Sequence, residues 1–247
     1  MINKLVKKIF GLVGYKLIEK KLIKNTRLIS EKSILNINTI LKILFNNYKI
    51  NLLIQVGAND GKRFDELNIF IKNYKIRSIL VEPIEEQFNQ LKLNYQNVDF
   101  VYFENSAISV NNEISYLYTV DNIYLNNYDS HIPAINSFKK EHLIKHGVKK
   151  NHIIKKKINT ISIKELVKKY NAENIDLLYV DTEGYDGKIV YDFITNFSKK
   201  PIIIFEFVHI DSNFFEQLII ELNKKEFLYF SINENLVCFP KEKNIFN

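Results

Sequence analysis

Short apolar runs alternate with segments of helical periodicity along most of the chain. Apolar runs of strand length occur at 51–56, 78–82, 98–103, 175–181, 201–208, 227–231 and 235–239. Helical spacing of apolar residues follows the first, second, fourth and fifth of these runs. Strands that alternate with helices pack as a mostly parallel sheet that is covered on both faces. The polar turn "NEN" joins the last two runs, so we expect an antiparallel pair at one edge.

Two segments depart from this rhythm. Residues 3–24 place apolar side chains on one helical face and lysines elsewhere, and a second helical stretch spans 33–46. The first helix could pack on the domain, on a second copy in a homodimer, or on a membrane surface. Residues 111–160 are polar and aromatic, with one short helix expected near 138–146, and long excursions of this kind often form lids or substrate loops. We therefore divide the chain into an N-terminal helical extension, 1–48, and one α/β domain, 49–247, with an insertion at about 111–160.

Composition adds bounds on the partners. The 247 residues are 46% hydrophobic, which suffices for one substantial core. Lys and Arg number 35 against 28 Asp and Glu, so the net charge of +7 is compatible with an anionic substrate, RNA or a membrane surface. The lysines are spread along the chain, and "KKNHIIKKK" at 149–157 is the only dense basic run. An RNA-binding protein or RNA methyltransferase therefore stays open as an alternative, and we expect no DNA partner.

The location follows from what the sequence lacks. Cys238 is the single cysteine, so neither an intrachain disulfide nor a thiolate metal cage can form. No stretch approaches the roughly 20 apolar residues of a membrane span. The basic N-terminus has no small-residue cleavage site after its short apolar centre. We expect a cytoplasmic protein, at the inner face of the membrane if the first helix binds lipid.

The first strand ends in "QVGANDG", a glycine-hinged turn that leads into a helix. A P-loop needs four residues between its glycines and then Lys-Ser/Thr, whereas three residues separate Gly57 from Gly61 and Lys62 is followed by Arg63. A dinucleotide fingerprint needs Gly-x-Gly-x-x-Gly, which is absent, and Asp60 would repel a pyrophosphate. S-adenosylmethionine has a cationic sulfonium and no phosphate, so it suits this turn.

Two later strand ends support the same ligand. Glu82, in "VEP", follows the turn by about 20 residues, at the position where a carboxylate can accept both ribose hydroxyls. The third strand ends in "ENSAIS", which would place Asn105 to Ala107 beside the adenine. The turn and these two strand ends occur in the order that an S-adenosylmethionine site requires.

These motifs resemble a known family. "IQVGANDG", "LVEPIEEQFNQL", "NSAIS", "NSFKKEHLIKH" and "IDLLYVDTEGYDGKIV" are similar to the successive motifs of FkbM-type S-adenosylmethionine-dependent methyltransferases, over roughly residues 50–210. The resemblance implies a class I methyltransferase fold with seven strands in the order 3-2-1-4-5-7-6. It also implies methyl transfer to a hydroxyl, commonly of a sugar or secondary metabolite, and hence a small-molecule or glycan substrate. The cofactor-binding residues implied are Gln55, Gly57, Asn59, Asp60, Gly61, Glu82, Pro83, Ser106, Ala107 and Asp181. Gln55 stands where many members have Asp.

Acidic residues and one histidine follow the fourth and fifth strands, where ligands collect in a doubly wound sheet. A hydroxyl is a poor nucleophile, so a base or a metal would raise its reactivity. We take Asp181, Glu183 and His209 as catalytic candidates. Asp181, Glu206 and His209 are also candidates for a divalent metal, magnesium or manganese. The alternative is structural: an aspartate here, Asp181 or Asp186, would cap the next helix.

The insertion holds the remaining candidates. His142 and His146 have i, i+4 spacing, but "EHLIKH" lacks the glutamate of a His-Glu-x-x-His zinc site, so we do not expect zinc there. Aromatic faces pack well on sugar rings. The substrate candidates are Tyr124, Tyr128, Ser137 and Phe138.

Overall fold

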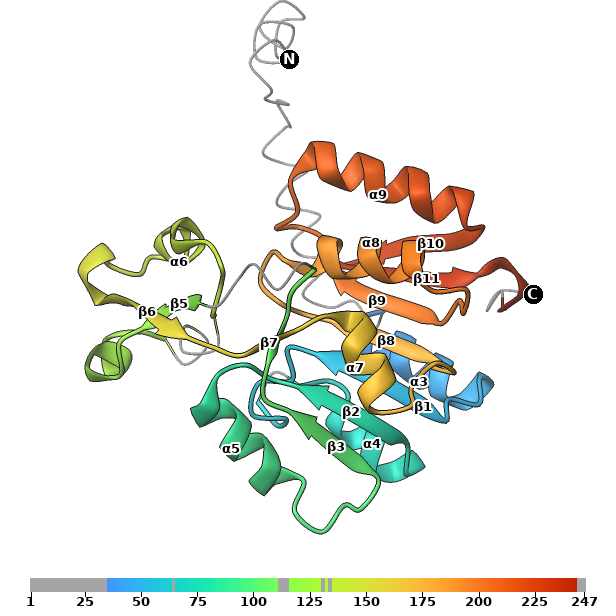
Figure 1. Cartoon of the computed structure of the whole chain (residues 1–247), viewed down its shortest axis with the longest axis horizontal. Coiled ribbons are helices and arrows are strands. Elements are labelled where there is room, and N and C mark those ends of the chain that lie inside the picture. Colours follow the sequence, from blue (N-terminus) through green and yellow to red (C-terminus); the bar gives the residue numbers. More distant parts are fainter. Residues whose placement is uncertain (1–34, 64, 111–115, 130–131, 133–134, 244–247) are drawn as a thin grey trace, which may run out of the picture.

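A seven-stranded sheet forms the centre of the protein (Figure 1). The computed structural model describes residues 35–243 except 64, 111–115, 130–131 and 133–134, so the helix predicted at 3–24 lies outside the described residues. The strands of this sheet are β1 (Leu52–Val56), β2 (Arg77–Val81), β3 (Val101–Glu104), β8 (Leu177–Val180), β9 (Ile202–Glu206), β10 (Phe227–Ile232) and β11 (Asn235–Pro240).

The strand order is the one that the family resemblance implied. It runs β3-β2-β1-β8-β9-β11-β10, which is 3-2-1-4-5-7-6 when only these seven strands are counted. The first five strands in sequence are parallel, and β11 is antiparallel to both β9 and β10. The class I methyltransferase fold and the antiparallel edge pair are therefore confirmed.

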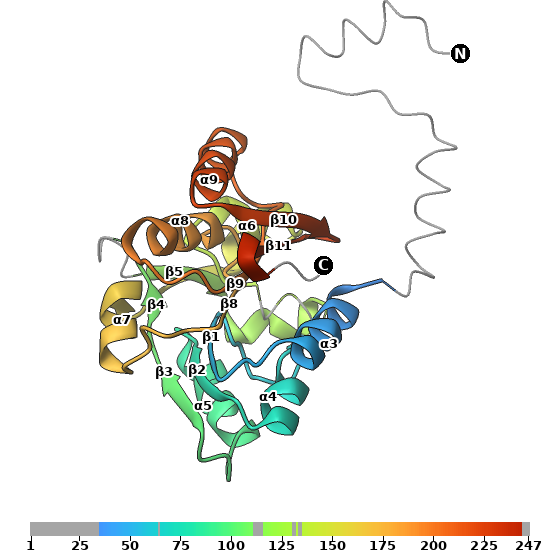
Figure 2. The same ribbon diagram turned by 90° about the vertical axis from the view of Figure 1, so that its right-hand side faces the viewer.

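Alternation along the strands separates two hydrophobic cores. In β1, Ile54 and Val56 pack into the core under α7 (Ile163–Lys169), α8 (Asp186–Asn196) and α9 (Ser212–Lys224), whereas Leu53 points to the opposite face. That opposite face is covered by α3 (Ile37–Asn47), α4 (Asn68–Tyr74) and α5 (Glu85–Asn94) (Figure 2). Because both faces are buried, β1 reads as a continuous apolar run interrupted only by Gln55.

The helix α3 belongs to the domain core. The Asn36 side chain caps it by accepting the Thr39 backbone N–H at 3.0 Å. Leu41 and Leu44 are fully buried and pack in the same cluster as β1 and α4. This helix therefore packs with the domain, although it lies inside the segment predicted as an extension. Of the helices in the described part of the chain, none is long and apolar enough to cross a membrane.

The insertion has secondary structure and a small core of its own. Its strand β5 (Tyr116–Val120) pairs antiparallel with β6 (Ile153–Lys157), and the helix α6 (Lys140–Lys145) packs nearby, as the pattern predicted. Val120, Ile135 and Leu143 contribute to the buried cluster. Two short strands, β4 (Ala107–Ile108) and β7 (Thr160–Ile161), pair in parallel where the insertion leaves and rejoins the domain. Figure 1 shows the insertion beside the sheet.

Candidate active site

A cavity of about 440 Å³ opens at the carboxyl ends of β1, β2, β8 and β9, and the insertion supplies one wall. It combines residues from strand ends that are distant in the sequence. Among the residues predicted to bind the cofactor, those that line the cavity are Gln55, Gly57, Asn59, Glu82, Pro83, Ser106, Ala107 and Asp181.

Gly57 lets the cofactor turn pass close to the loop that follows β8. Its φ is +85°, and a Cβ built on it would lie 1.7 Å from the carbonyl oxygen of Asp181. The backbone N–H groups of Gly57 and Ala58 both donate to the carbonyl of Val81 at 3.0 Å. Only glycine combines this conformation with such an approach, so the turn is fixed between β2 and β8.

Glu82 is buried at the end of β2 and faces the turn. Its Oε2 accepts the Asn59 N–H and its Oε1 accepts the Ile84 N–H, each at 2.9 Å. Burial raises the pKa of Glu82 to about 7, although these two hydrogen bonds act to lower it. A carboxylate oxygen can accept two hydrogen bonds, so each oxygen retains one acceptor site. Two adjacent acceptors suit the two hydroxyls of a ribose.

Gln55 offers a second point of fit. Its Nε2 donates to Asp65 Oδ1 at 3.1 Å. Its Oε1 is buried at the cavity wall and has no hydrogen-bond partner among the described residues. A buried acceptor without a donor is costly, so a ligand that brings a donor would bind there favourably. The ammonium of an amino-acid moiety is such a donor.

Asp60 and Gly61 support the turn from behind and do not line the cavity. The Asp60 carboxylate accepts the backbone N–H groups of Lys62 and Arg63 and the Arg63 Nε at 2.6 Å. A Cβ on Gly61 would lie 2.3 Å from Leu91 Cδ1. These two residues shape the loop and let the helix pack, and their contact with the cofactor stays a prediction.

The loop between β8 and α8 presents the Glu183 side chain to the cavity. The Asp186 carboxylate accepts the backbone N–H of Thr182, its hydroxyl and the backbone N–H of Gly184, each at 3.0 Å. Ser137 Oγ donates to the Glu183 carbonyl at 3.0 Å. Glu183 has φ +55°, which is uncommon for a residue with a side chain. These contacts hold it in that conformation, and Asp186 has the structural role that the sequence left open.

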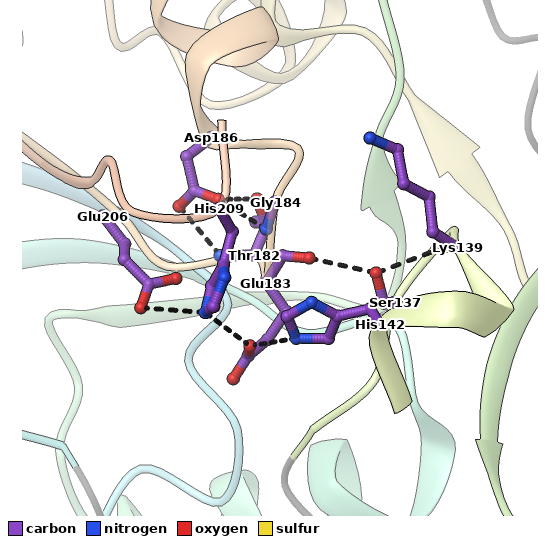
Figure 3. Close-up of polar contacts among 9 residues, drawn as sticks. All are labelled: Ser137, Lys139, His142, Thr182, Glu183, Gly184, Asp186, Glu206 and His209. Atoms are coloured by element: carbon purple, nitrogen blue, oxygen red, sulfur yellow. Dashed lines mark hydrogen bonds and ion pairs between the residues drawn. The ribbon is translucent and has the colours of Figure 1, made fainter. Parts of the chain in front are cut away.

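Three histidines meet this carboxylate. His142 Nε2 lies 2.7 Å from Glu183 Oε2, and His209 Nε2 lies 4.0 Å from the same oxygen and 3.6 Å from Glu206 Oε1 (Figure 3). The His146 ring centroid lies 4.6 Å from that of His142 and 5.7 Å from that of His209. The sequence grouped His209 with Asp181 and Glu206, whereas the structure also brings the histidine pair of the insertion to the strand ends.

The comparison with known protein families decides the identity. Residues 55–229, more than half of the chain, match the methyltransferase FkbM domain. The chain belongs to the FkbM methyltransferase family. It is an S-adenosylmethionine-dependent methyltransferase, and the cavity residues above fit that cofactor. No functionally curated protein matches the chain.

Solved structures similar to this methyltransferase are distant. An O-methyltransferase from Bacillus cereus in complex with S-adenosylhomocysteine aligns at 8% identity over 96% of this chain and 97% of that one, with a TM-score of 0.43. A methyltransferase from Geobacter sulfurreducens aligns at 10% identity over 96% and 98%, with a TM-score of 0.42. The identification rests on the family match.

The cavity of the methyltransferase is strongly acidic at its acceptor side. Asp181 is accessible through the open cavity but is surrounded by protein elsewhere. The resulting desolvation raises its pKa, and the negative charges of Asp186 and Glu183 raise it further. Burial, followed by the neighbouring carboxylates, raises the pKa of Glu206 to about 9. Burial and His142 lower the pKa of His209. Around neutral pH, Glu206 is therefore protonated and His209 is neutral.

The substrate candidates divide between the cavity and the interior of the insertion. Phe138 lines the cavity and packs edge-to-face on Tyr185, while Ser137 is buried behind Glu183. Tyr124 stacks on His152 with ring centroids 3.7 Å apart, and Tyr128 Oη lies 2.7 Å from His152 Nδ1. Neither tyrosine lines the cavity, so both anchor the insertion. The apolar wall residues Leu117 and Ile135 carry no sequence signal of their own and were missed.

Proposed function

We propose that the protein methylates a hydroxyl of a sugar in a surface polysaccharide, a glycan or a sugar precursor. The observation that carries this proposal is the placement of His209, Glu183 and Asp181 in the same cavity as the cofactor-binding turn. A hydroxyl that enters from the insertion side would have a proton acceptor and an adjacent methyl donor. The apolar wall of Leu117, Ile135 and Phe138 suits the face of a sugar ring.

The residues of the chain position the acceptor and manage its proton. S-adenosylmethionine supplies an electrophilic methyl group when it is bound. His209 in its neutral form, or the Asp181 carboxylate, accepts the proton of the hydroxyl, and the Glu183 carboxylate orients the imidazoles around it. Protonated Glu206, 3.6 Å from His209 Nε2, adds no further negative charge at this point. Alignment of the reactants accounts for most of the expected acceleration.

The charge of the cavity restricts the acceptor. Among the described residues, its lining contains seven carboxyl side chains and no lysine or arginine: Asp65, Glu66, Glu82, Asp181, Glu183, Glu206 and Glu234. A diphosphate placed among them would be repelled. We infer that the part of the substrate inside the cavity is uncharged or cationic. A nucleotide sugar would have to keep its diphosphate outside.

The RNA alternative gains no support from the basic run of the insertion. Lys156 pairs with Glu86, and Lys155 lies over the Tyr116 ring at 4.3 Å from its centroid. These lysines are thus engaged with the domain and with a tyrosine of the neighbouring strand. If RNA is the substrate, its affinity for the protein should fall steeply as the salt concentration rises. An RNA affinity that does not change with salt would exclude this alternative.

The experiment that tests the proposal is methyl transfer by the full chain to defined acceptors. Neutral oligosaccharides and nucleotide sugars are incubated with S-adenosylmethionine, and a mass gain of one methyl group is sought. His209→Ala should lower kcat by roughly 10²-fold with little change in cofactor affinity. Methylation of RNA would overturn the proposal. So would a failure to methylate any of the glycans by a protein that binds RNA.

A further inference from the structure

The three histidines and Glu183 come from separate parts of the fold. His142 lies in α6, His146 follows one turn later at the end of that helix, Glu183 lies in the loop after β8, and His209 follows β9. Spacing of i, i+4 places the first two side chains on one face of α6. We propose that His142, His146, Glu183 and His209 bind a divalent transition-metal ion of the zinc type at the acceptor side of the cavity.

The distances are close to those of a coordination sphere. One ligand atom from each of the four residues can be chosen so that all lie within 4.8 Å of one another. A tetrahedral ion with bonds of about 2.0–2.1 Å separates its ligand atoms by roughly 3.3 Å. The 2.7 Å contact between His142 and Glu183 would open slightly, and the 4.0 Å contact between His209 and Glu183 would close. Side-chain rotations of this size leave the backbone unchanged.

The surroundings hold the carboxylate in position for such an ion. Glu183 keeps its left-handed backbone because Asp186 binds the backbone N–H groups of Thr182 and Gly184 on either side of it, and Ser137 binds its carbonyl. Strain retained by the surrounding structure is typical of functional sites. His142 is almost fully buried, so its imidazole is held between α6 and the loop. Figure 3 shows Glu206 on the opposite side of His209 from His142, with its Oε1 3.6 Å from His209 Nε2.

The ligand set selects the kind of metal. Three imidazoles and one carboxylate suit Zn²⁺, Fe²⁺, Mn²⁺, Co²⁺ or Ni²⁺, whereas Mg²⁺ and Ca²⁺ prefer oxygen ligands only. The site therefore differs from the magnesium or manganese site predicted at Asp181, Glu206 and His209, because it takes two histidines from the insertion. With one carboxylate ligand, the bound ion would keep a net positive charge.

The ion would also connect the two parts of the protein that surround the acceptor. His146, Glu183 and His209 line the same cavity as Gly57 and Glu82. Coordination would tie α6 of the insertion to the loops after β8 and β9. An ion that took a fifth ligand beyond these four side chains would also be a Lewis acid beside the acceptor hydroxyl. The metal site depends only on the four side chains, so it holds whichever hydroxyl is methylated.

Metal binding by the tag-free, full-length protein tests the proposal without any methyl transfer. The protein is dialysed against a chelator and titrated with Zn²⁺ by calorimetry in the presence of excess Mg²⁺; Co²⁺ serves as a visible-absorption probe of the coordination number. We expect one equivalent of Zn²⁺ and a rise in Tm. His146→Ala and Glu183→Gln should weaken Zn²⁺ binding by more than about 100-fold, since even changes behind the ligands cost about 10–100-fold.

His152 provides the matched control. It is a buried histidine of the insertion that stacks on Tyr124 and belongs to no described cluster of metal-ligating side chains. His152→Gln should retain the full Zn²⁺ affinity, even if its Tm falls. Absence of stoichiometric Zn²⁺ binding to the wild type would overturn the proposal. So would unchanged affinity in His146→Ala and Glu183→Gln, both confirmed as folded by circular dichroism.

Discussion

Replacing Glu82 should weaken S-adenosylmethionine binding by a predictable amount. In the free protein both carboxylate oxygens accept one backbone N–H and retain one acceptor site each. Two ribose hydroxyls would use these sites in charge-assisted hydrogen bonds. For Glu82→Ala, part of this loss is recovered by water, which leaves about 1.5–3 kcal/mol. The Kd should therefore rise by about 10- to 150-fold.

Calorimetric titration with S-adenosylmethionine measures this change. Glu82→Ala also removes the contacts to Asn59 and Ile84, so thermal unfolding of the free variant must show that the turn still folds. Glu86→Gln is the matched control, because Glu86 is an exposed carboxylate of α5 that pairs with Lys156 and does not line the cavity. A folded Glu82→Ala variant with a Kd within twofold of wild type would refute the ribose assignment.

The pH dependence gives an independent check on the same carboxylate. Burial raises the pKa of Glu82 to about 7, so its ionised fraction grows as the pH rises through 7. The ionised form has two free acceptor sites and the protonated form fewer, so affinity should increase from pH 6 to pH 8, by up to about tenfold. The ammonium of the ligand also titrates in this range. The ratio of wild-type to Glu82→Gln affinity removes that contribution, and a pH-independent ratio would contradict the mechanism.

Three further predictions concern the turn, the metal and the N-terminus. Gly57→Ala should abolish cofactor binding and lower Tm strongly, whereas Gly147→Ala, at the same φ of +85° with no atom within 4 Å of its Cβ, should cost only about 1–2 kcal/mol of unfolding free energy. Equal Tm values would show that the approach to Asp181 is unimportant. Methyl-transfer activity should be lost after exhaustive chelation and restored by Zn²⁺. Activity that persists after chelation would leave His209 as the base. Deleting residues 1–24 should leave the cofactor Kd unchanged. Liposome flotation and sedimentation of the full-length and the truncated protein would distinguish membrane attachment from dimerisation.

The sheet and the cofactor turn could be predicted because their signals are local. Apolar runs bounded by turn residues predicted all seven strands. The third strand departs most from its expected bounds, because β3 begins at Val101 and the apolar run begins at residue 98. Gly57 and Glu82 lie at the ends of adjacent strands β1 and β2, so their spacing in the sequence fixes their proximity in space. The ends of β1 and β2 therefore indicated residues that line one cavity.

The acceptor side could not be predicted in the same way, because it depends on how the insertion packs. Nothing local indicates that α6 lies over the ends of β8 and β9, so the i, i+4 spacing of His142 and His146 had no visible partner. The two tyrosines predicted as substrate contacts are also placed by the packing of the insertion, and their role stays a prediction. Tyr124 and Tyr128 are aromatic residues in a polar segment, and they are partly buried against the core of the insertion, where both contact the His152 ring.

The acidity of the cavity connects the cofactor side with the acceptor side. Carboxylates gathered in one cavity repel one another, and desolvation with this repulsion raises the pKa of Asp181 and Glu206. Without a cationic ligand, protons supply the compensating charge. The sulfonium and ammonium of the cofactor can supply it at one end of the cavity, and a metal ion between His209 and Glu183 can supply it at the other. Each cation that binds thus lowers the energetic cost of ionising the remaining carboxylates, which frees Asp181 to act as a base. The net positive charge of the chain contributes little here, because the lining that the described residues form includes no lysine or arginine.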